Sequence, residues 1–303
     1  MQIRFFAIAL AVLAAPSAAS VYRAHAKNTM VSSSFERAKN LPGASDFTAA
    51  RLYTSVQCGT SVVPIEAFRA AIDTDTKILV GLWASAGRDE FKNELNALIN
   101  AVTTLGSTFT DRVIGISVGS EDLYRSSPAG IANKAGPGAT AGEIQGYINW
   151  AREWLKATPL ESKPITHVDT WTAWILPESK VVIDAVDFLS QNSFPYFEDA
   201  RPNAIEQASD NFLSGLSATV EVAKGKDIWI TETGWPAIGP TLRDAVPSVE
   251  NARTYWNTVG CALFGKRNTF WYTLVDAAMT EGDLSFGITP ADDTTPKFDL
   301  ACS

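Results

Sequence analysis

The sequence has few of the groups that bind metals or nucleic acids. Its 303 residues include only two histidines and three cysteines, and no CxxC or HExxH motif occurs. The 25 Lys and Arg residues are outnumbered by 33 Asp and Glu residues, without any basic run. The scarcity of histidine and cysteine argues against a metal site. The lack of a basic run argues against a nucleic-acid partner, because no row of cations could neutralise its phosphates. The glycines of residues 135–138 follow no strand and predict a turn, so we expect no cofactor.

The chain also lacks a hydrophobic run long enough for a transmembrane helix, which needs about 18 or more apolar residues. Near the N-terminus, Arg4 precedes a short apolar run at residues 5–15, and small residues follow at 17–19. This pattern predicts a secretory signal peptide at residues 1–19, and Pro16 disfavours the alternative of a buried helix. The C-terminus has neither a hydrophobic tail nor a Ser/Thr-rich stalk, so we expect a secreted protein without a lipid anchor.

Three cysteines suit an exported protein with one structural disulfide. We expect Cys261 to pair with Cys302, because this bridge would tie the C-terminal tail to the last third of the chain. Cys58 is then the remaining cysteine, and we interpret it as a half-buried apolar residue. A catalytic thiol would need a histidine partner, and only His25 and His167 are present.

Apolar runs typical of buried strands alternate with amphipathic, helix-like segments along the chain. The runs are continuous and rich in β-branched and aromatic residues, as in parallel strands that are covered on both faces. No linker separates them, and we predict one α/β domain at residues 20–303, a (β/α)8 TIM barrel. The predicted strands are residues 50–53, 77–83, 113–119, 164–169, 185–192, 227–231 and 269–274, and the clearest helices are residues 90–105, 141–155, 203–223 and 249–263.

The first strand of this barrel is poorly represented or missing. Little chain lies between the predicted signal peptide and Arg51, and residues 33–40 already look helical. Residues 21–25 are the only place left for a first strand, and their pattern is poor. A barrel without that strand would have two unpaired edges.

Two carboxylates follow apolar strands at corresponding positions. Glu121 comes after Val118-Gly119-Ser120, whose small residues we expect to let a substrate approach, and Glu232 follows 111 residues later. A single such glutamate would be a surface charge or a neighbour of a helix cap. Because catalytic groups of these barrels project from the carboxyl ends of strands, the pair indicates cleavage of a glycosidic bond.

Other aromatic and acidic residues also stand at predicted strand ends and could stack on or bind sugar rings. They are Tyr53, Trp83, Asp169, Trp171, Tyr196 and Asp276. We assign Trp229, Trp256 and Trp271 to the core, and we interpret His167 as a satisfied polar residue of the barrel wall. Arg51 and Arg125 either orient a carboxylate or form surface ion pairs, and the sequence leaves both possibilities open.

From residue 37 to the C-terminus, the chain resembles glycoside hydrolase family 17, the β-1,3-glucanases. In particular, it is similar to fungal cell-wall glucan endo-1,3-β-glucosidases, which normally carry a lipid-anchored tail. The motifs that carry the resemblance include Gly115–Arg125, His167–Trp174 and Trp229–Pro236. Departures are the missing first strand, which the family has as a Gly-Phe-Asn-Tyr-Gly type, and the missing anchor tail.

The resemblance implies a retaining double displacement on β-1,3-glucan, with Glu121 as the acid/base and Glu232 as the nucleophile. It implies that Tyr196 orients the nucleophile. It also implies that the sugar subsites are lined by Tyr53, Trp83, Tyr124, Asp169, Trp171 and Asp276.

Two alternatives remain open. A transglycosylase would use the same covalent intermediate but pass it to another glucan instead of water. A glucan-binding wall protein without turnover would not need both glutamates. Nothing in the sequence requires more than a monomer.

Overall fold

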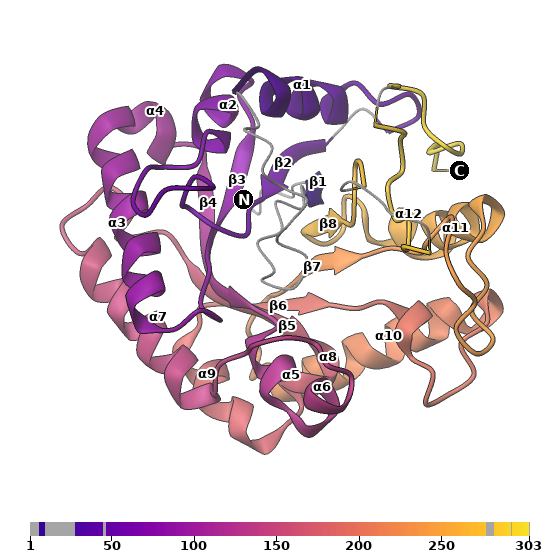
Figure 1. The fold of residues 1–303 in the computed structure, drawn as a ribbon. Coiled ribbons are helices and arrows are strands. Elements are labelled where there is room, and N and C mark those ends of the chain that lie inside the picture. The colour runs from indigo at the N-terminus through magenta and orange to yellow at the C-terminus, as the bar shows by residue number, and fades with distance from the viewer. Residues whose placement is uncertain (1–5, 10–27, 45–46, 277–281, 292, 303) are drawn as a thin grey trace.

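The computed structural model describes residues 6–9, 28–44, 47–276, 282–291 and 293–302. Its eight strands are all parallel and form a closed barrel in the order of the sequence, surrounded by helices (Figure 1). All seven strands predicted from the sequence are present, so the TIM-barrel prediction is confirmed. The strands are β1 Phe6–Ala9, β2 Phe47–Arg51, β3 Lys77–Leu82, β4 Val113–Ser120, β5 Ile165–Thr170, β6 Leu189–Asn192, β7 Ile228–Thr233 and β8 Thr269–Trp271.

The first strand, β1, has only four residues, and its register against β2 is broken between Phe6 and Ala7. It pairs with β2 on one side and with β8 on the other, which closes the barrel. We expected the first strand to be missing or to lie at residues 21–25, and this is corrected because Phe6–Ala9 forms it. Residues 21–25 lie outside the described residues. The strand instead belongs to the run that predicts a signal peptide. Short apolar runs suit both a leader and a strand between two parallel neighbours, so composition could not separate them.

The longer helices follow the predicted segments closely. In α3, the buried residues Phe91, Leu95 and Leu98 form one apolar stripe against the barrel. The start of α7 is fixed by a capping box, in which Thr140 and Glu143 bind each other's backbone amides. The helices are α1 Asn28–Lys39, α2 Ala67–Asp73, α3 Arg88–Leu105, α4 Ser107–Thr110, α5 Asp122–Ser126, α6 Pro128–Ala132, α7 Ala141–Leu155, α8 Trp171–Trp174, α9 Lys180–Ala185, α10 Ile205–Val222, α11 Val249–Tyr255 and α12 Cys261–Leu263; η1 Pro177–Ser179 and η2 Pro195–Phe197 are 3₁₀ turns, and η3 Trp256–Gly260 is a π-helical turn.

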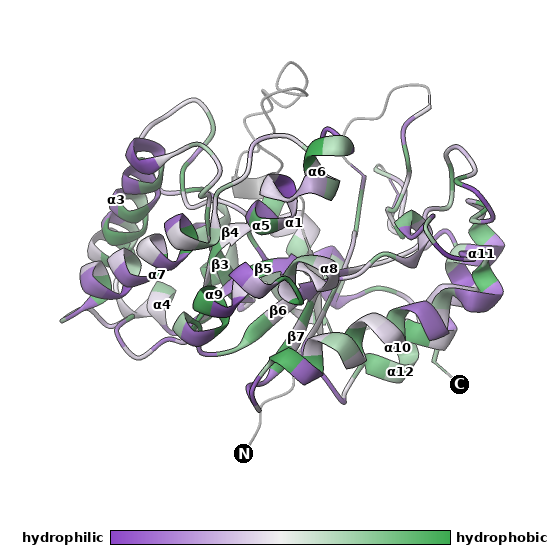
Figure 2. Ribbon diagram, turned by 90° about the horizontal axis from the view of Figure 1, so that it is seen from below, coloured by the Kyte–Doolittle hydropathy of each residue, from purple (hydrophilic) through white to green (hydrophobic). Residues whose placement is uncertain are grey.

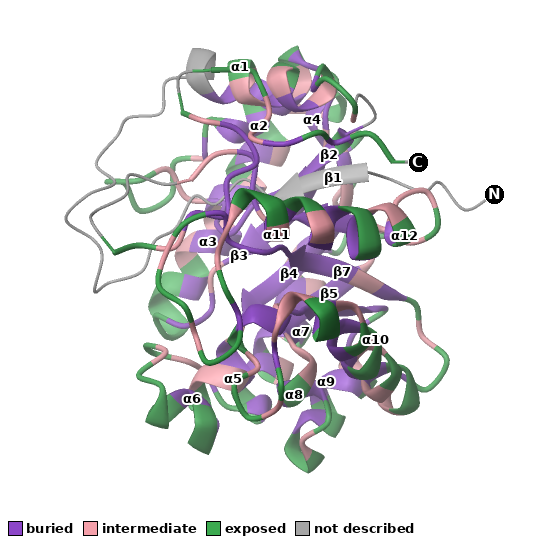
Figure 3. Ribbon diagram, turned by 90° about the vertical axis from the view of Figure 1, so that its right-hand side faces the viewer, coloured by how far each residue is buried: buried purple, intermediate pink, exposed green. Residues whose placement is uncertain are grey.

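The core has two parts, because the barrel wall has an inner and an outer face. The larger part lies between strands and helices, and it contains the buried Trp256 and Trp271. The smaller part has no helical residue and fills the barrel, with Trp229 packed on Phe188 at 4.2 Å between ring centroids. Figure 3 shows strands such as β3, β4 and β5 largely buried and the exposed residues on the outer helices and loops. Figure 2 shows these helices with both hydrophobic and hydrophilic residues.

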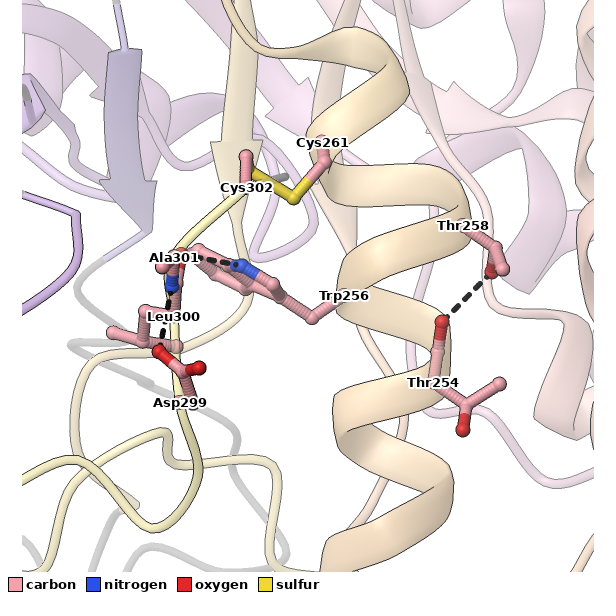
Figure 4. Close-up of a disulfide and its surroundings, with 8 residues drawn as sticks. All are labelled: Thr254, Trp256, Thr258, Cys261, Asp299, Leu300, Ala301 and Cys302. Atoms are coloured by element: carbon pink, nitrogen blue, oxygen red, sulfur yellow. Dashed lines mark hydrogen bonds between the residues drawn. A yellow bond between two sulfur atoms is a disulfide. The ribbon is translucent and has the colours of Figure 1, made fainter.

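The C-terminal tail is attached to the region that follows β7 by the Cys261–Cys302 disulfide, as predicted (Figure 4). Beside it, the buried Leu300 accepts a hydrogen bond on its carbonyl oxygen from Trp256 Nε1 over 3.0 Å. Cys58 is exposed rather than half-buried. Among the described residues, no helix has the length and apolar character needed to span a membrane.

Candidate active site

Glu121 and Glu232 lie at the same end of the barrel. Glu121 directly follows β4, and Glu232 is the penultimate residue of β7. Because the strands are parallel, their carboxyl ends meet at one face. Both side chains are largely enclosed, with 24% of Glu121 and 10% of Glu232 exposed. The structure therefore brings together the two carboxyl groups that the sequence singled out.

Two side chains from the end of β2 converge on Oε1 of Glu232. The hydroxyl of Tyr53 donates to it over 2.6 Å, and Nη1 of Arg51 forms a salt bridge with the same oxygen. The Arg51 guanidinium also lies over the Tyr53 ring, 4.2 Å from its centroid. These contacts fix the orientation of the carboxylate and place a cation beside it.

Arg51 also connects the two strands that carry the carboxylates. It is fully buried, and its Nη2 donates over 2.8 Å to Oγ of Ser120, the residue before Glu121. Burial lowers the pKa of the Arg51 guanidinium, but Tyr53 and Glu232 together raise it by more than burial lowers it. The pKa is therefore above its usual value, and the guanidinium stays charged. Burial, and then the charge of Glu232, raises the pKa of Tyr53 well above its usual value, so its phenol stays a proton donor.

Glu121 has different surroundings. Its Oε1 accepts a hydrogen bond from Nδ2 of Asn192 over 3.0 Å, and its Oε2 lies 3.9 Å from Nη2 of Arg125. Burial, and then the negative charge of Glu232, raises the pKa of Glu121 to about 7. A carboxyl group with this pKa keeps its proton in mildly acidic solution, as a general acid must.

Asn192 was not predicted as a site residue. Its Oδ1 accepts from the Thr231 hydroxyl over 2.9 Å, which turns its amide nitrogen towards Glu121. Asn192 thereby links the end of β6 to β7, one residue before Glu232. Its place at the end of the predicted strand 185–192 was the signal that could have found it.

The backbone at Glu121 is in the left-handed region, at φ 60° and ψ 24°, where residues other than glycine are uncommon. Gly119 has φ 78°, and a Cβ atom there would lie 2.2 Å from Oδ2 of Asp122. Its small size therefore accommodates the chain's own Asp122 carboxylate. This corrects our expectation that the small residues before Glu121 serve to admit a substrate.

A model of the BtgE/BtgC glycoside hydrolase domain matches residues 20–288. The chain belongs to this family. It is 50% identical over 270 residues to a probable glucan endo-1,3-beta-glucosidase, eglC, of Aspergillus fumigatus, covering 89% of this chain and 60% of that protein. The corresponding protein of Aspergillus terreus is 44% identical over 290 residues, or 95% of this chain and 58% of its own length. The chain thus spans about three fifths of these relatives.

Solved structures agree with the fold. A glycoside hydrolase family 17 β-1,3-glucanosyltransferase from Rhizomucor miehei superposes with a TM-score of 0.76 at 23% identity, covering 96% of this chain and 95% of that one. CJP38, a β-1,3-glucanase of Cryptomeria japonica pollen, gives a TM-score of 0.66 at 15% identity, with 99% of both chains covered. The family 17 resemblance inferred from the motifs is confirmed by the family match and the fungal relatives.

In this glycoside hydrolase domain, Tyr196 does not bind Glu232, the residue that we predicted it to orient. It is buried in η2, and its hydroxyl donates to the carbonyl oxygen of Pro240. Its ring packs edge-on against Trp235, 5.8 Å away. The hydroxyl that reaches Glu232 belongs to Tyr53, which we had expected only to line a subsite. Strand β6 ends at Asn192, and the following turn carries Tyr196 towards the β7 loop.

The two aspartates predicted to line subsites accept hydrogen bonds from the chain's own donors. Asp169 is fully buried and accepts from His167 and from three backbone amides. Asp276 accepts from the backbone amides of Phe286 and Gly287 over 2.7 and 2.6 Å, and from a serine and a lysine. Both carboxylates hold backbone segments at the end of the barrel where Glu121 and Glu232 lie.

Three predicted aromatic residues are partly exposed near the helices that follow β3, β4 and β5. Arg125 lies over the ring of Trp83 at 5.3 Å, which connects this ring to the partner of Glu121. The hydroxyl of Tyr124 accepts from Asn133 over 2.9 Å. The indole of Trp171 donates to Glu198 over 3.0 Å. Their roles in sugar subsites stay predictions.

An aromatic cluster that we did not predict surrounds Tyr272, the residue directly after β8. Phe194 packs against Tyr272 and Phe286, with ring centroids 5.6 and 5.4 Å away. Burial, and then the charges of Glu232, Asp276 and Glu121, raises the pKa of Tyr272 above its usual value. Tyr272 lies near the end of the predicted strand 269–274, so a search for aromatic residues at strand ends could have identified it as a site residue.

Glu94 is a further residue that the sequence analysis missed. It is a buried acid on the apolar face of α3. Its Oε2 accepts from the backbone amide of Ser55 over 2.6 Å, and its Oε1 accepts from the Thr54 hydroxyl. Burial raises the pKa of Glu94 to about 7. It therefore holds the segment directly after Tyr53. The sequence feature that could have identified Glu94 is a single acidic residue among the apolar positions of the helix.

Proposed function

We propose that this domain is a retaining endo-β-1,3-glucan hydrolase that acts on fungal cell-wall glucan. The observation that carries the proposal is the unequal setting of the two carboxyl groups. Glu232 lies beside the Arg51 cation, whereas burial and the Glu232 charge raise the pKa of Glu121 to about 7. One is suited to attack as an anion and the other to donate a proton. The names of the fungal relatives support β-1,3-glucan as the substrate.

In the first step, a carboxylate oxygen of Glu232 bonds to the anomeric carbon while the bond from that carbon to the leaving oxygen breaks. Glu121 gives its proton to the leaving oxygen, and a glucan alcohol departs. The Tyr53 hydrogen bond orients the nucleophile, and Arg51 balances its charge before the attack. Asn192 holds the carboxyl of Glu121 at the end of β6.

In the second step, Glu121 is a carboxylate and takes a proton from water. The water oxygen bonds to the anomeric carbon, and the bond to Glu232 breaks, which returns both residues to their starting states. Two inversions at one carbon give net retention. If another glucan hydroxyl takes the place of water, the same intermediate leads to transglycosylation.

The test is incubation of the purified chain with a defined β-1,3-gluco-oligosaccharide, with products analysed by mass spectrometry and proton NMR. We expect shorter products whose new reducing ends appear first as the β-anomer. Products longer than the substrate would assign the transferase activity instead. E232Q should retain glucan binding and lose turnover, and unchanged turnover in E232Q would overturn the assignment.

The pH profile provides a second test of the acid. Glu121 must be protonated for the first step, and its pKa is raised to about 7. We therefore expect the rate of the first step to fall as the pH rises through about 7. In E121A, an activated aryl glycoside and added azide should restore turnover, because a good leaving group needs no proton and azide needs no general base.

We further propose that the protein is secreted to the cell wall or medium as a monomer, after cleavage of residues 1–19. The Cys261–Cys302 disulfide suits an oxidising compartment, and the fungal relatives are named as glucan-processing enzymes. Intact-mass and native mass spectrometry of the protein recovered from culture medium would test the cleavage and the monomer.

A further inference from the structure

Three titratable side chains with no exposed surface lie behind Glu121. Asp122 begins α5, and His167 and Asp169 belong to β5. None of them binds Glu232 or donates to the Glu121 carboxyl in the contacts described above. Such a buried polar cluster is stable only when its members satisfy one another.

Both ring nitrogens of His167 face hydrogen-bond acceptors. Nδ1 lies 2.6 Å from the carbonyl oxygen of Val118 in β4, and Nε2 lies 2.9 Å from Oδ2 of Asp169. A carbonyl oxygen and a carboxylate oxygen can only accept, so each nitrogen must carry a hydrogen. The ring is held edge-on against Trp174 of α8, with centroids 5.6 Å apart. With Asp169 as a carboxylate, this geometry requires the imidazolium form.

The charges around the ring agree with that form. Burial opposes the charge of His167, but the hydrogen bond to Asp169 and the charges of Asp169 and Asp122 raise its pKa above the usual value. The groups that face it are Asp169 on β5, the Val118 carbonyl on β4, Asp122 on α5 and the uncharged Trp174 on α8. Arg125, also on α5, acts on Asp122.

The two aspartates bind backbone groups on both sides of Glu121. Asp122 accepts from the Ser120 amide over 2.8 Å. Asp169 accepts from the amides of Leu123 and Tyr124 over 2.8 and 3.2 Å. These contacts hold the strand end and the first turn of α5. They therefore surround Glu121, the residue of this turn that has left-handed backbone angles, which are uncommon for a residue with a side chain.

We propose that His167 is a positioning residue for Glu121, acting as a permanently charged buried imidazolium that joins β4 to Asp169. Through Asp169 it fixes the turn that aims the Glu121 carboxyl. The effect on turnover rests on the proposed acid role of Glu121, whereas the protonation of His167 does not.

The protonation is tested by NMR of the full chain with ¹⁵N-labelled histidine. The sequence has only two histidines, so H25Q assigns the two sets of ring signals. We expect both His167 ring nitrogens to carry slowly exchanging protons, unchanged between about pH 5 and 8, the range in which an ordinary histidine titrates. A ring with one unprotonated nitrogen in this range would overturn the proposal, whether or not the chain hydrolyses glucan.

The positioning role is tested with H167Q, which removes the charge and one of the two ring contacts. A misplaced acid matters most when the leaving group needs a proton. We therefore expect kcat to fall on the order of 10–100-fold for a β-1,3-gluco-oligosaccharide, with KM little changed. For a dinitrophenyl β-glycoside, we expect a much smaller loss.

The matched control is F109L, a change in the buried core at α4, where Phe109 packs on Phe68 of α2. It lowers stability without moving Glu121, so its kcat losses should be the same for both substrates. If wild type is active and H167Q shows equal losses for both substrates, the positioning role is overturned. An inactive wild type would instead count against the proposed function, and the NMR result would still decide the charge of His167.

Discussion

The hydroxyl of Tyr53 and the carboxylate of Glu232 are joined by a 2.6 Å hydrogen bond across 179 positions of the sequence. The same carboxylate oxygen forms a salt bridge with Arg51, whose guanidinium lies over the Tyr53 ring. The three residues thus form one unit built from the ends of β2 and β7. The orientation of the proposed nucleophile therefore depends on β2 as much as on its own strand.

Y53F removes the hydroxyl and keeps the ring on which Arg51 lies. We expect kcat/KM for β-1,3-gluco-oligosaccharides to fall by roughly 10–100-fold, because the nucleophile loses one of the contacts that hold it. Stability should fall by about 1 kcal/mol, the net contribution of one hydrogen bond. Steady-state kinetics and urea unfolding measure the two effects.

The matched control is Y196F, since the Tyr196 hydroxyl binds the Pro240 carbonyl and not Glu232. It should lose a similar amount of stability and keep most of the activity. An equal loss of activity in both variants would contradict the assignment of Tyr53 as the residue that orients the nucleophile.

R51M leaves the enclosed Glu232 carboxylate without its cation. Removing one partner of a buried ion pair costs about 3–5 kcal/mol, because the remaining charge stays desolvated. We expect this loss in the free energy of unfolding from urea denaturation. In the double variant R51M/E232Q the uncompensated charge is gone, so the loss should be smaller than the sum of the two single losses.

Arg112 provides the comparison, because its pair with Asp75 is exposed, with 73% of the aspartate side chain accessible. R112M should cost less than about 1 kcal/mol. Strictly additive effects of R51M and E232Q would show that the buried pair has no coupling energy.

E94Q should change how stability depends on pH. The pKa of Glu94 is raised by burial from 4.5 to about 7. Between these values, the folded protein keeps a proton that the unfolded chain has released. Stability from this group is therefore present at low pH and lost as the pH rises through about 7, by up to roughly 3 kcal/mol. We expect E94Q to flatten this fall in urea unfolding between pH 4.5 and 7.

Substitutions of two other carboxyl groups serve as comparisons for the urea unfolding of E94Q. Glu121 has the same direction of shift, to about 7, so E121Q should flatten the profile in the same sense. Glu206 is exposed in the first turn of α10, and E206Q provides the control for removal of a surface carboxyl. A wild-type profile that rises with pH from 4.5 to 7, unchanged by E94Q, would contradict the prediction.

Removal of residues 1–19 should destabilise the barrel. These residues include β1, which pairs with β2 and β8. Without it, the two strands have unpaired edges. We expect the chain of residues 20–303 to melt at a lower temperature than the chain of residues 1–303. Its β2 and β8 amides should also exchange hydrogen faster.

In the same exchange experiment, the β4–β5 pair serves as the internal control, because its ladder does not involve β1. Equal melting temperatures, with equal protection of β2 and β8, would show that β1 contributes nothing to the closed barrel. This comparison also measures what signal cleavage would cost the mature protein.

The repeating strands and the placement of Glu121 and Glu232 follow from the sequence, because both are local. An apolar run between turns and a carboxylate directly after it are visible within ten or so residues, and parallel strands then bring such ends together. The Cys261–Cys302 bridge was also accessible, since one of the three possible pairs ties the tail to the last third of the chain.

Only the tertiary structure determined which side chains contact one another at the site. Which tyrosine reaches Glu232, whether Arg51 forms a buried pair, and where the oxygens of Asp169 point all depend on contacts between distant elements. The choice of Phe6–Ala9 as the first strand was decided in the same way, by the open place between β2 and β8. Local pattern selects the type of element, whereas the barrel's closure and packing determine which side chains meet.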